Sequence, residues 1–370
     1  MSTRPDVMQL LTDARPRRLE PDDRPDPAAF TAHPRPAAGR RRSVPRRLAL
    51  AGALPAVAAA AVAALVLTSG GGTDPVTGPT GPGTTAVAAQ PDSARELLLV
   101  AAEKTDAGGA ATSGRYWVRV QEHGERKEVG PAGGRYGIAA RFQIERWQAT
   151  GAGDPTVDVQ QDLGAVPVTA ADEAAWKADG SPDRWTETGP AGTKPIVRTT
   201  APGPRIVRPL RGGPLLMIAG QPVTTADLAG LPTEPAALKA WVTARLRQGG
   251  GTESDAVALF YAGRDLVAEL PVTAAVRSAA YRMLADLPGV DFLGVVQDRQ
   301  GRSGMAVAYT RRGDGGWGQQ RLIVDPGTGR ALAQESWFLG SGGAAAATGT
   351  LMSWTVQVSS RYTDDAAPTA

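Results

Sequence analysis

Few residues in this chain could perform acid–base, nucleophilic or metal chemistry. The sequence holds two His and no Cys, with His33 in a basic N-terminal stretch and His123 in a predicted turn. Zinc and iron–sulfur sites need several imidazole or thiolate ligands, and a Ser-His-Asp triad would depend on His123 alone. We therefore predict a non-enzymatic protein without catalytic, cofactor-binding or metal-ligating residues.

Two further motifs have some chemical potential. The segment Gly313–Gly318 matches G-x-G-x-x-G, but both of its flanks have strand character, which predicts a hairpin loop instead of a nucleotide site. Two carboxylate pairs, Asp154 with Asp158 and Asp364 with Asp365, lack the ligand spacing of a Ca²⁺ loop. We interpret them as solvated side chains.

The eight Trp residues offer a third possibility, because aromatic side chains often line pockets for apolar ligands. Trp117, Trp147, Trp241 and Trp337 are the candidates for such a cavity. The alternative is that they pack in the core and against the sheet.

One segment is suited to crossing a membrane. Leu48–Leu67 contains 20 residues without a charge, which as a helix would span about 30 Å, the thickness of the bilayer hydrocarbon. Six Arg lie between Arg35 and Arg47, and the twenty residues after the segment contain no Lys or Arg. This asymmetry predicts a single-pass protein of the cell membrane with a cytoplasmic N-terminus. A cleaved signal peptide and a twin-arginine signal at Arg46-Arg47 are alternatives, although 47 residues precede the apolar segment.

The positive charge is concentrated in the N-terminal tail. Residues 1–47 hold 11 Arg and 6 acidic residues, so of 40 basic and 37 acidic residues in all, 29 basic and 31 acidic residues remain after position 47. The rest of the chain is therefore nearly neutral, and we predict no nucleic-acid partner. Val7, Met8, Leu10 and Leu11 could form a small docking helix for a cytoplasmic regulatory partner, or the tail could only fix topology and touch anionic lipid.

The composition divides the chain into five parts. We expect a largely disordered basic cytoplasmic tail at 1–47, a transmembrane helix at 48–67, a Gly/Pro/Thr-rich linker at 68–91, an extracytoplasmic α+β domain at 92–362 and a disordered C-terminus at 363–370.

Local patterns place the elements of the domain. Ser93 and Glu96 have capping-box spacing ahead of an apolar run, and Thr169 can cap a second short helix. Alternation of apolar and polar residues predicts strands, and capped apolar periodicity predicts three consecutive helices. The strands are expected at 115–122, 138–145, 157–163, 290–297, 304–311, 318–324, 330–338 and 351–360, and the three helices at 235–247, 255–270 and 274–287.

The order of these elements predicts the fold class. Strands followed by helices and then strands indicate α+β, with a curved antiparallel sheet and inserted helices after one transmembrane helix. Asp298–Gly301 and Asp325–Gly329 carry the turn residues that let flanking strands pair as hairpins. A lipoprotein-carrier-like architecture is one form of this arrangement.

Several motifs at turns and helix ends resemble an actinobacterial family of single-pass membrane proteins of unknown function, designated only by a locus tag. They are Asp172–Trp176 with Gly180–Pro182, Leu231–Thr233 before Leu238 and Trp241, Val276–Arg277 through Tyr281–Arg282 to Leu287–Val290, Asp298 with Gly301–Arg302, and Leu322–Arg330. The resemblance covers nearly the whole chain and carries no functional residue. It implies a cell-envelope protein, sometimes encoded near extracytoplasmic-function sigma factors.

Three functions follow as hypotheses. The first is a non-enzymatic envelope sensor or regulator linked to sigma-factor signalling, whose ectodomain binds an apolar ligand or an envelope protein. The second is a lipid- or lipoprotein-binding carrier-like module, which would need an enclosed apolar cavity between the sheet and the three helices. The third is a hydrolase, for which the sequence supplies no converging nucleophile and base.

Overall fold

The computed structural model describes residues 90–107, 113–151, 153–187, 194–210, 216–249, 255–313, 315–341 and 349–369. All of them belong to one compact unit. The predicted cytoplasmic tail, the apolar segment Leu48–Leu67 and the linker up to residue 89 lie outside the described residues. Among the described helices, none combines the length and the apolar character that a membrane span requires.

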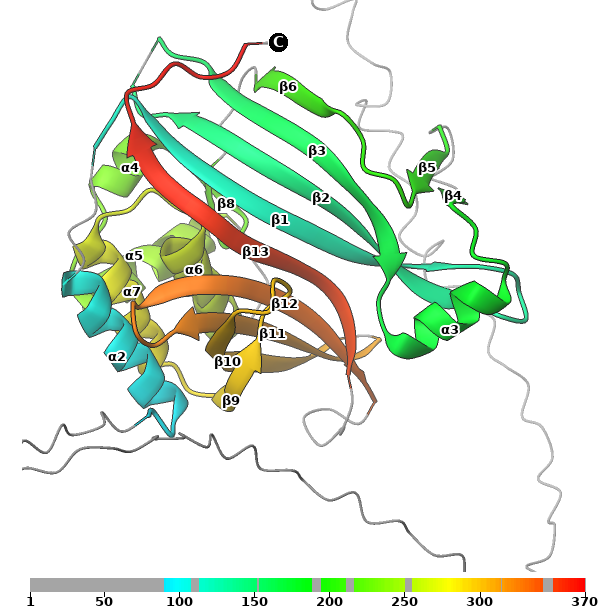
Figure 1. Ribbon diagram of the computed structural model, residues 1–370. Helices are drawn as coiled ribbons and strands as arrows, with labels where there is room; N and C mark the ends of the chain where they lie inside the picture. The colour runs from blue at the N-terminus through cyan, green and yellow to red at the C-terminus, as the bar shows by residue number, and fades with distance from the viewer. Residues whose placement is uncertain are drawn as a thin grey trace, which may run out of the picture. The chain divides into compact units, whose positions relative to one another are not determined.

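Nine strands form one open antiparallel sheet, which confirms the α+β class (Figure 1). Its order is β6-β3-β2-β1-β13-β12-β11-β10-β9, so β6 and β9 are the edges. The strands are β1 (Tyr116–Val129), β2 (Tyr136–Ala149), β3 (Thr156–Pro167), β6 (Arg205–Leu210), β9 (Val290–Gln297), β10 (Ser303–Gly313), β11 (Gly316–Asp325), β12 (Arg330–Gly340) and β13 (Thr350–Thr363). Every neighbouring pair is antiparallel.

Most of the described helices gather on one side of the sheet, whereas α3 lies apart from them, against β2 and β3 (Figure 1). They are α2 (Ala94–Ala107), α3 (Ala170–Ala178), α4 (Thr225–Ala229), α5 (Pro235–Gln248), α6 (Asp255–Ala268) and α7 (Ala274–Ala285). Two small ribbons complete the described elements, β4 (Arg184–Glu187) with β5 (Ile196–Thr199) and β7 (Leu216–Ile218) with β8 (Gln221–Val223).

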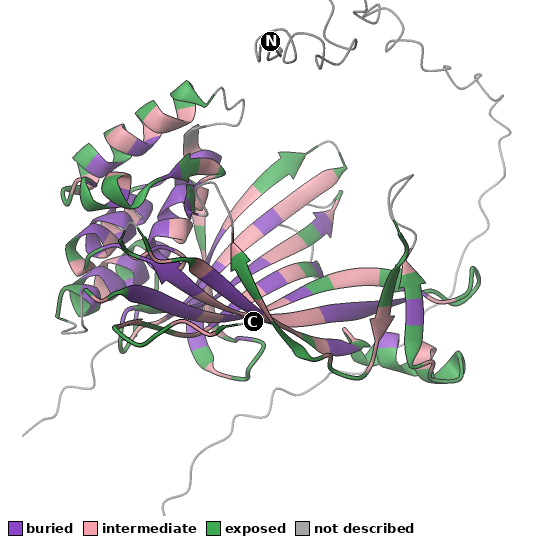
Figure 2. Ribbon diagram, turned by 90° about the horizontal axis from the view of Figure 1, so that it is seen from above, coloured by how far each residue is buried: buried purple, intermediate pink, exposed green. Residues whose placement is uncertain are grey.

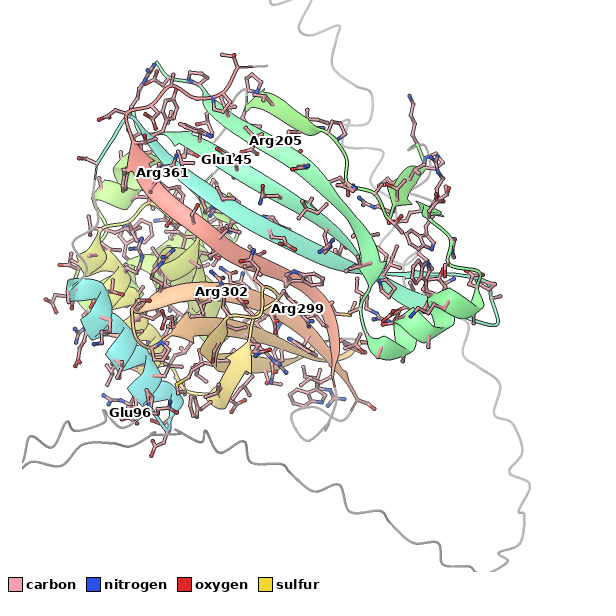
Figure 3. All side chains as sticks on the ribbon, viewed as in Figure 1. Glu96, Glu145, Arg205, Arg299, Arg302 and Arg361 are labelled. Carbon is pink, nitrogen blue, oxygen red and sulfur yellow. The ribbon has the colours of Figure 1, made fainter. Side chains whose placement is uncertain are left out.

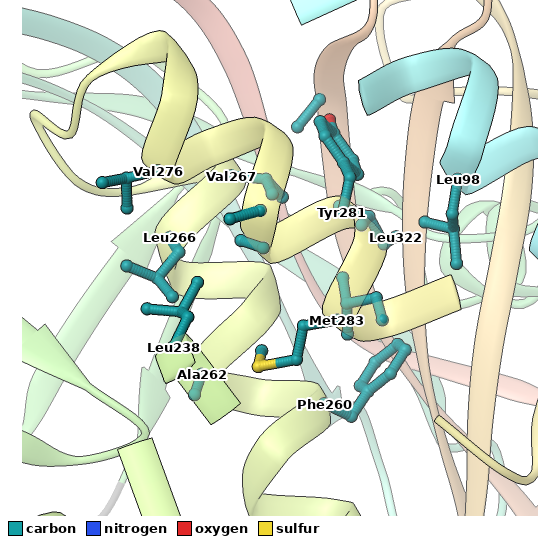
Figure 4. Close-up of a cluster of buried hydrophobic side chains, with 14 of the residues drawn as sticks. Leu98, Leu238, Phe260, Ala262, Leu266, Val267, Val276, Tyr281, Met283 and Leu322 are labelled. Atoms are coloured by element: carbon teal, nitrogen blue, oxygen red, sulfur yellow. The ribbon is translucent and has the colours of Figure 1, made fainter. Parts of the chain in front are cut away.

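The largest core lies between the helices and the strands β10–β12. Leu98 of α2, Phe260 of α6 and Leu284 of α7 pack there with Val307 and Leu322 of the sheet, and each is almost fully buried (Figure 4). Burying such a side chain contributes about 1.5 to 3 kcal/mol, so the apolar stripes of the helices account for their position on this face. Figure 2 shows the buried residues concentrated in the helices and in the strands beneath them.

The opposite face of the same strands is also covered. Ala306 of β10 and Ile323 of β11 each lie between two residues of the helix-side core, and they belong to a second cluster with Ala333, Trp354 and Val356. Because β10–β12 are buried on both faces, their apolar residues form near-continuous runs instead of strict alternation.

Helix ends follow the capping chemistry in the sequence. Thr169 accepts a hydrogen bond from the Asp172 N–H, and the Asp172 carboxylate accepts one in return from the Thr169 N–H, which together form a capping box for α3. Asp172 also accepts two hydrogen bonds from Arg126 (2.9 and 3.1 Å) and one from the Gly137 N–H (2.7 Å). Burial alone would raise the pKa of Asp172, but these donors lower it to about 2 and fix α3 against β1 and β2.

Two predictions about individual residues are wrong. His123 does not lie in an exposed turn, because β1 continues to Val129 and pairs along its whole length with β2. Asp158 is not solvated, since it is 2% exposed and accepts two hydrogen bonds from Arg146 at 2.7 and 2.8 Å. In both cases polar residues face other parts of the protein, so their polarity gave the wrong indication of exposure.

Candidate functional site

A cavity of about 450 Å³ lies where the helices meet the sheet. Its walls come from the C-terminal end of α2, the α6–α7 connection with the start of α7, the β11–β12 turn, and strands β1 and β13. The volume is within the range of small-molecule sites, which is about 300 to 1,000 Å³. This cavity is therefore large enough for an organic ligand.

The β11–β12 turn is held rigidly against two helices. The carboxylate of Asp325 accepts hydrogen bonds from the Gly327 N–H (2.9 Å) and the Thr328 hydroxyl (2.6 Å), which closes the turn. The carbonyl of Gly329 accepts a hydrogen bond from the Tyr281 hydroxyl of α7 at 2.9 Å. Gly329 has φ +70°, and a Cβ there would lie 2.5 Å from the Ala101 carbonyl oxygen of α2, so only glycine fits.

The α6–α7 connection forms another wall. Thr273 caps α7 by accepting a hydrogen bond from the Val276 N–H at 3.2 Å. The Tyr362 hydroxyl of β13 donates to the Pro271 carbonyl at 3.2 Å, which ties the connection to the sheet. Arg277 follows in the first turns of α7 and lines the cavity.

Four cationic side chains line the cavity: Lys104 of α2, Arg277 of α7, Arg330 of β12 and Arg361 of β13. No Asp or Glu occurs among the described residues that line it. Lys104, Arg330 and Arg361 are exposed, whereas Arg277 is half-buried. Figure 3 places Arg361 near the end of β13. The lining is therefore strongly positive, with one cation partly removed from water.

The environment of Arg277 disfavours its charge. Burial lowers the pKa of Arg277, the neighbouring Arg330 lowers it further, and Tyr281 and Tyr362 act in the opposite direction. Its Nη2 donates to the Val272 carbonyl over a long distance of 3.4 Å. Among the described residues the Arg277 guanidinium has no short, charge-assisted hydrogen bond of the kind that normally accompanies burial.

A buried carboxylate lies behind the cavity wall. Glu269, just after α6, accepts hydrogen bonds from Arg119 and from the side-chain amides of Gln121, Gln334 and Gln357, the three amides each at 3.0 Å. Burial opposes ionisation of Glu269, but Arg119 and Gln121 outweigh it and hold its pKa below the usual range. The negative charge of Glu269 is thus already matched by Arg119.

The four tryptophans proposed for an apolar cavity do not converge. Trp117 lines the cavity. Trp147 belongs to a separate cluster on β1–β3, and Trp241 packs against the helix-side core. Trp337 packs against the cluster on the opposite face, with the Arg321 guanidinium 4.1 Å from its ring centroid. The structure brings one of the four to the cavity and distributes the others among three packing clusters.

The remaining motifs serve the fold. Gly313 pairs with Gly316 in the β10–β11 hairpin, as predicted. Asp154 is paired with Arg115, whose backbone N–H also donates to Asp364 at 2.9 Å. Asp365 accepts a hydrogen bond from the Thr363 hydroxyl. In the described ranges, no group of three His, Cys, Asp or Glu side chains could hold a metal ion.

Sequence reasoning missed all four cations of the cavity. They come from four elements that are distant in the sequence, so no local pattern connects them. One signal was present at Arg277, which lies one helical turn before Tyr281 and next to Val276, both fully or nearly buried. A cation on the buried side of an apolar helix is unusual enough to indicate a site.

Comparison with protein-family models, with curated proteins and with solved structures finds no match to this chain. The assignment of function therefore depends on the geometry of the cavity.

Proposed function

We propose that this chain is a membrane-anchored envelope protein whose extracytoplasmic domain binds a small ligand without transforming it. The carrying observation is the cavity of about 450 Å³, which is walled by five separate parts of the fold. Its lining supplies cations and apolar groups but no carboxylate or imidazole that could act as a general base. This lining favours binding over catalysis.

A sensor role is supported by the position of the cavity. A ligand there would contact α2, the α6–α7 connection, the β11–β12 turn and β13 at the same time. Its binding energy would add to the contacts that hold the helices on the sheet, and a bound state would differ in stability from the free state. The apolar segment Leu48–Leu67 and the family resemblance support a link through the membrane to cytoplasmic, sigma-factor-associated signalling.

A carrier-like module is the second candidate. It is supported by the open antiparallel sheet with helices on one face, an architecture similar to that of lipoprotein carriers. Trp117, Leu270 and Val272 would give the cavity one apolar wall. However, the space between the helices and β10–β12 is filled by core side chains such as Phe260 and Leu322, which leaves little room for acyl chains. The sensor is therefore the better-supported function.

Native mass spectrometry of the full-length chain, extracted in mild detergent, tests the proposal. The wild type should retain a small molecule from the host membrane or cytosol, or acquire one from an added extract. Ser359→Trp should abolish retention, because Ser359 lines the cavity on β13 and a Trp side chain would fill it. Ser353→Trp is the matched control on the same strand, since Ser353 does not line the cavity.

The proposal requires both variants to melt cooperatively, as followed by circular dichroism. Retention by wild type and Ser353→Trp, with loss in Ser359→Trp, would support a ligand site in the cavity. Equal retention in all three proteins, or no ligand in any of them, would overturn it.

A further inference from the structure

We propose that the ligand of this cavity carries a multiply charged oxyanion, such as a phosphate ester, and that Arg277 is the residue that anchors it. This inference rests on the proposed function, because it names the ligand class of the same cavity. It is based on the positive charge of the cavity lining, on the pairing of other arginines in the fold with carboxylates, and on the environment of Arg277.

Arginines elsewhere in the fold are commonly matched by carboxylates. Arg126 pairs with Asp172 at 2.9 Å and Arg146 pairs with Asp158 at 2.7 Å. Further pairs join Arg198 to Glu187, Arg205 to Glu145, Arg282 to Asp106 and Arg302 to Asp298. The four cations of the cavity differ, since none of them forms an ion pair of this kind with a described carboxylate.

Four cations that have no carboxylate partner among the described residues make the cavity attractive to an anion. Like charges held in one cavity repel one another, and Arg330 contributes to the lowered pKa of Arg277. A phosphate monoester carries about −1.5 to −2 at neutral pH and offers three acceptor oxygens. Several guanidinium and ammonium donors can bind these oxygens together, so a phosphate group suits this lining better than a single carboxylate does.

Arg277 is suited to the anchoring position because it is the least exposed of the four. Its side chain is half-buried, and the long contact with the Val272 carbonyl is its one hydrogen bond to the described residues. Partial burial of a cation without a carboxylate partner is unfavourable, and an entering anion would supply charge-assisted hydrogen bonds to the Arg277 guanidinium. A purely structural arginine would instead stabilise the fold in which it lies.

The rest of the cavity defines the remainder of the ligand. A volume of about 450 Å³ exceeds the space that a lone phosphate ion occupies, and Trp117, Leu270 and Val272 provide apolar contacts. The ligand is therefore an organic phosphate. The phosphate can belong to a soluble metabolite or to a phospholipid headgroup, because the same donors recognise both.

Calorimetric titration of the full-length chain in a neutral detergent distinguishes these sources. Glycerol 3-phosphate represents the soluble monoester, and mixed micelles with phosphatidic acid represent the lipid headgroup, with phosphatidylcholine micelles as the zwitterionic reference. Binding of either phosphate probe, but not of the reference, is expected for the wild type.

The decisive variant is Arg277→Gln, with Arg312→Gln as the matched control. Arg312 is an exposed residue of β10 beside the β10–β11 hairpin, at the opposite end of β11 from the turn that walls the cavity. Removing a charge-assisted contact should weaken binding of the phosphate probe about 10- to 100-fold in Arg277→Gln and leave it unchanged in Arg312→Gln.

A second readout separates anchoring from a structural role. Without ligand, Arg277→Gln should melt at the same temperature as the wild type or at a higher one, because the substitution removes an uncompensated charge. Equal phosphate affinity in wild type and Arg277→Gln, or a lower melting temperature of the empty variant, would overturn the inference. If a neutral ligand is retained by Arg277→Gln but lost in Ser359→Trp, the cavity is a ligand-binding site, but the proposal that its ligand carries an oxyanion is wrong. If neither variant changes ligand retention, the proposed function fails as well.

Discussion

Replacing Glu269 by Gln is the sharpest test of how the helices are attached to the sheet. The substitution preserves the size of the side chain but removes the charge that faces Arg119. It also turns an acceptor-only group into one with an N–H₂ that meets the amide donors of Gln121, Gln334 and Gln357. The variant leaves a nearly buried guanidinium without its counter-charge.

The expected loss in the free energy of unfolding can be estimated from the exposure of the two side chains. The Arg119 side chain is 10% exposed and that of Glu269 is 22% exposed. Removing one partner of a buried ion pair destabilises a protein by about 3 to 5 kcal/mol, and the partial exposure of Glu269 places this pair near the lower end of that range. We therefore expect a loss of about 3 kcal/mol, which corresponds to a melting temperature lower by about 6 to 12 °C.

The measurement is a double-mutant cycle, with unfolding followed by tryptophan fluorescence in the full-length chain. Glu269→Gln and Arg119→Met should each lower the free energy of unfolding by about 3 kcal/mol, because each substitution leaves the other partner without its counter-charge. The double variant leaves neither partner with an unmatched charge. Its loss of stability should be clearly smaller than the sum of the two single losses, with a coupling energy of about 2 kcal/mol or more. An additive cycle, or a cost of Glu269→Gln below about 1 kcal/mol, would refute this account of the attachment.

The pH dependence gives an independent check on the same pair. The folded pKa of Glu269 lies below the reference value of 4.5, so its stabilising contribution is fully present above that pH. It is lost as the pH falls through the lowered folded pKa. The difference in stability between wild type and Glu269→Gln should therefore remain constant from pH 7 to pH 5 and shrink only in more acidic solution.

Three further predictions concern single residues. Burial raises the pKa of Asp265 from 3.8 to about 6. This difference of roughly two pH units corresponds to about 3 kcal/mol of stability that is lost as the pH rises through this interval. Asp265→Asn should therefore stabilise the protein at pH 7 by up to that amount, as measured in a denaturant titration. Burial lowers the pKa of His123 from 6.5 to about 4, so wild type should lose stability as pH falls from 6.5 to 4, and melting curves of His123→Gln should lack this loss. Gly329→Ala should destabilise by about 2 kcal/mol or more, because strain at φ +70° adds to the clash with Ala101, whereas Gly301→Ala at φ +76° meets no neighbour within 4 Å and should cost about 1 kcal/mol less in the same assay.

The regular elements were predictable because their signals are local. The strand expected at 290–297 has the same bounds as β9, and the helices expected from Pro235, Asp255 and Ala274 begin at those residues. Caps and alternation involve only a few neighbouring residues, so they can be interpreted without the tertiary structure.

The failures occurred where tertiary contacts decide the structure. The strand expected at 115–122 extends to Val129 as β1, although polar residues occupy both of its faces, because pairing with β2 satisfies its backbone. The region from 183 to 220 showed no clear pattern, and its described residues form four short strands of three to six residues. Such short strands carry too little periodicity to be recognised.

Most of the candidate site was beyond local signals. Lys104, Arg330 and Arg361 each look like an ordinary surface cation in the sequence, and of the four cations only Arg277, beside the buried Val276, carried a local signal. The packing of α2 and α7 against the β11–β12 turn at the Gly329 carbonyl, and the pairing of β13 with β1, bring the four cations around one cavity. Of the predicted site residues, Trp117 alone reaches it.

The position of β13 sets the order in which this protein can fold. Although β13 is the last described strand, it lies between β1 and β12, and Tyr116 pairs with Thr363 across most of the domain sequence. The two halves of the sheet therefore stay unjoined until residues beyond 350 are available, and closing so long a loop makes folding slow. A chain stopped before Thr350 would expose β1 and β12 as two long unpaired edges. Such edges recruit strands from other molecules, so loss of the last strand should convert a folded domain into an aggregating one.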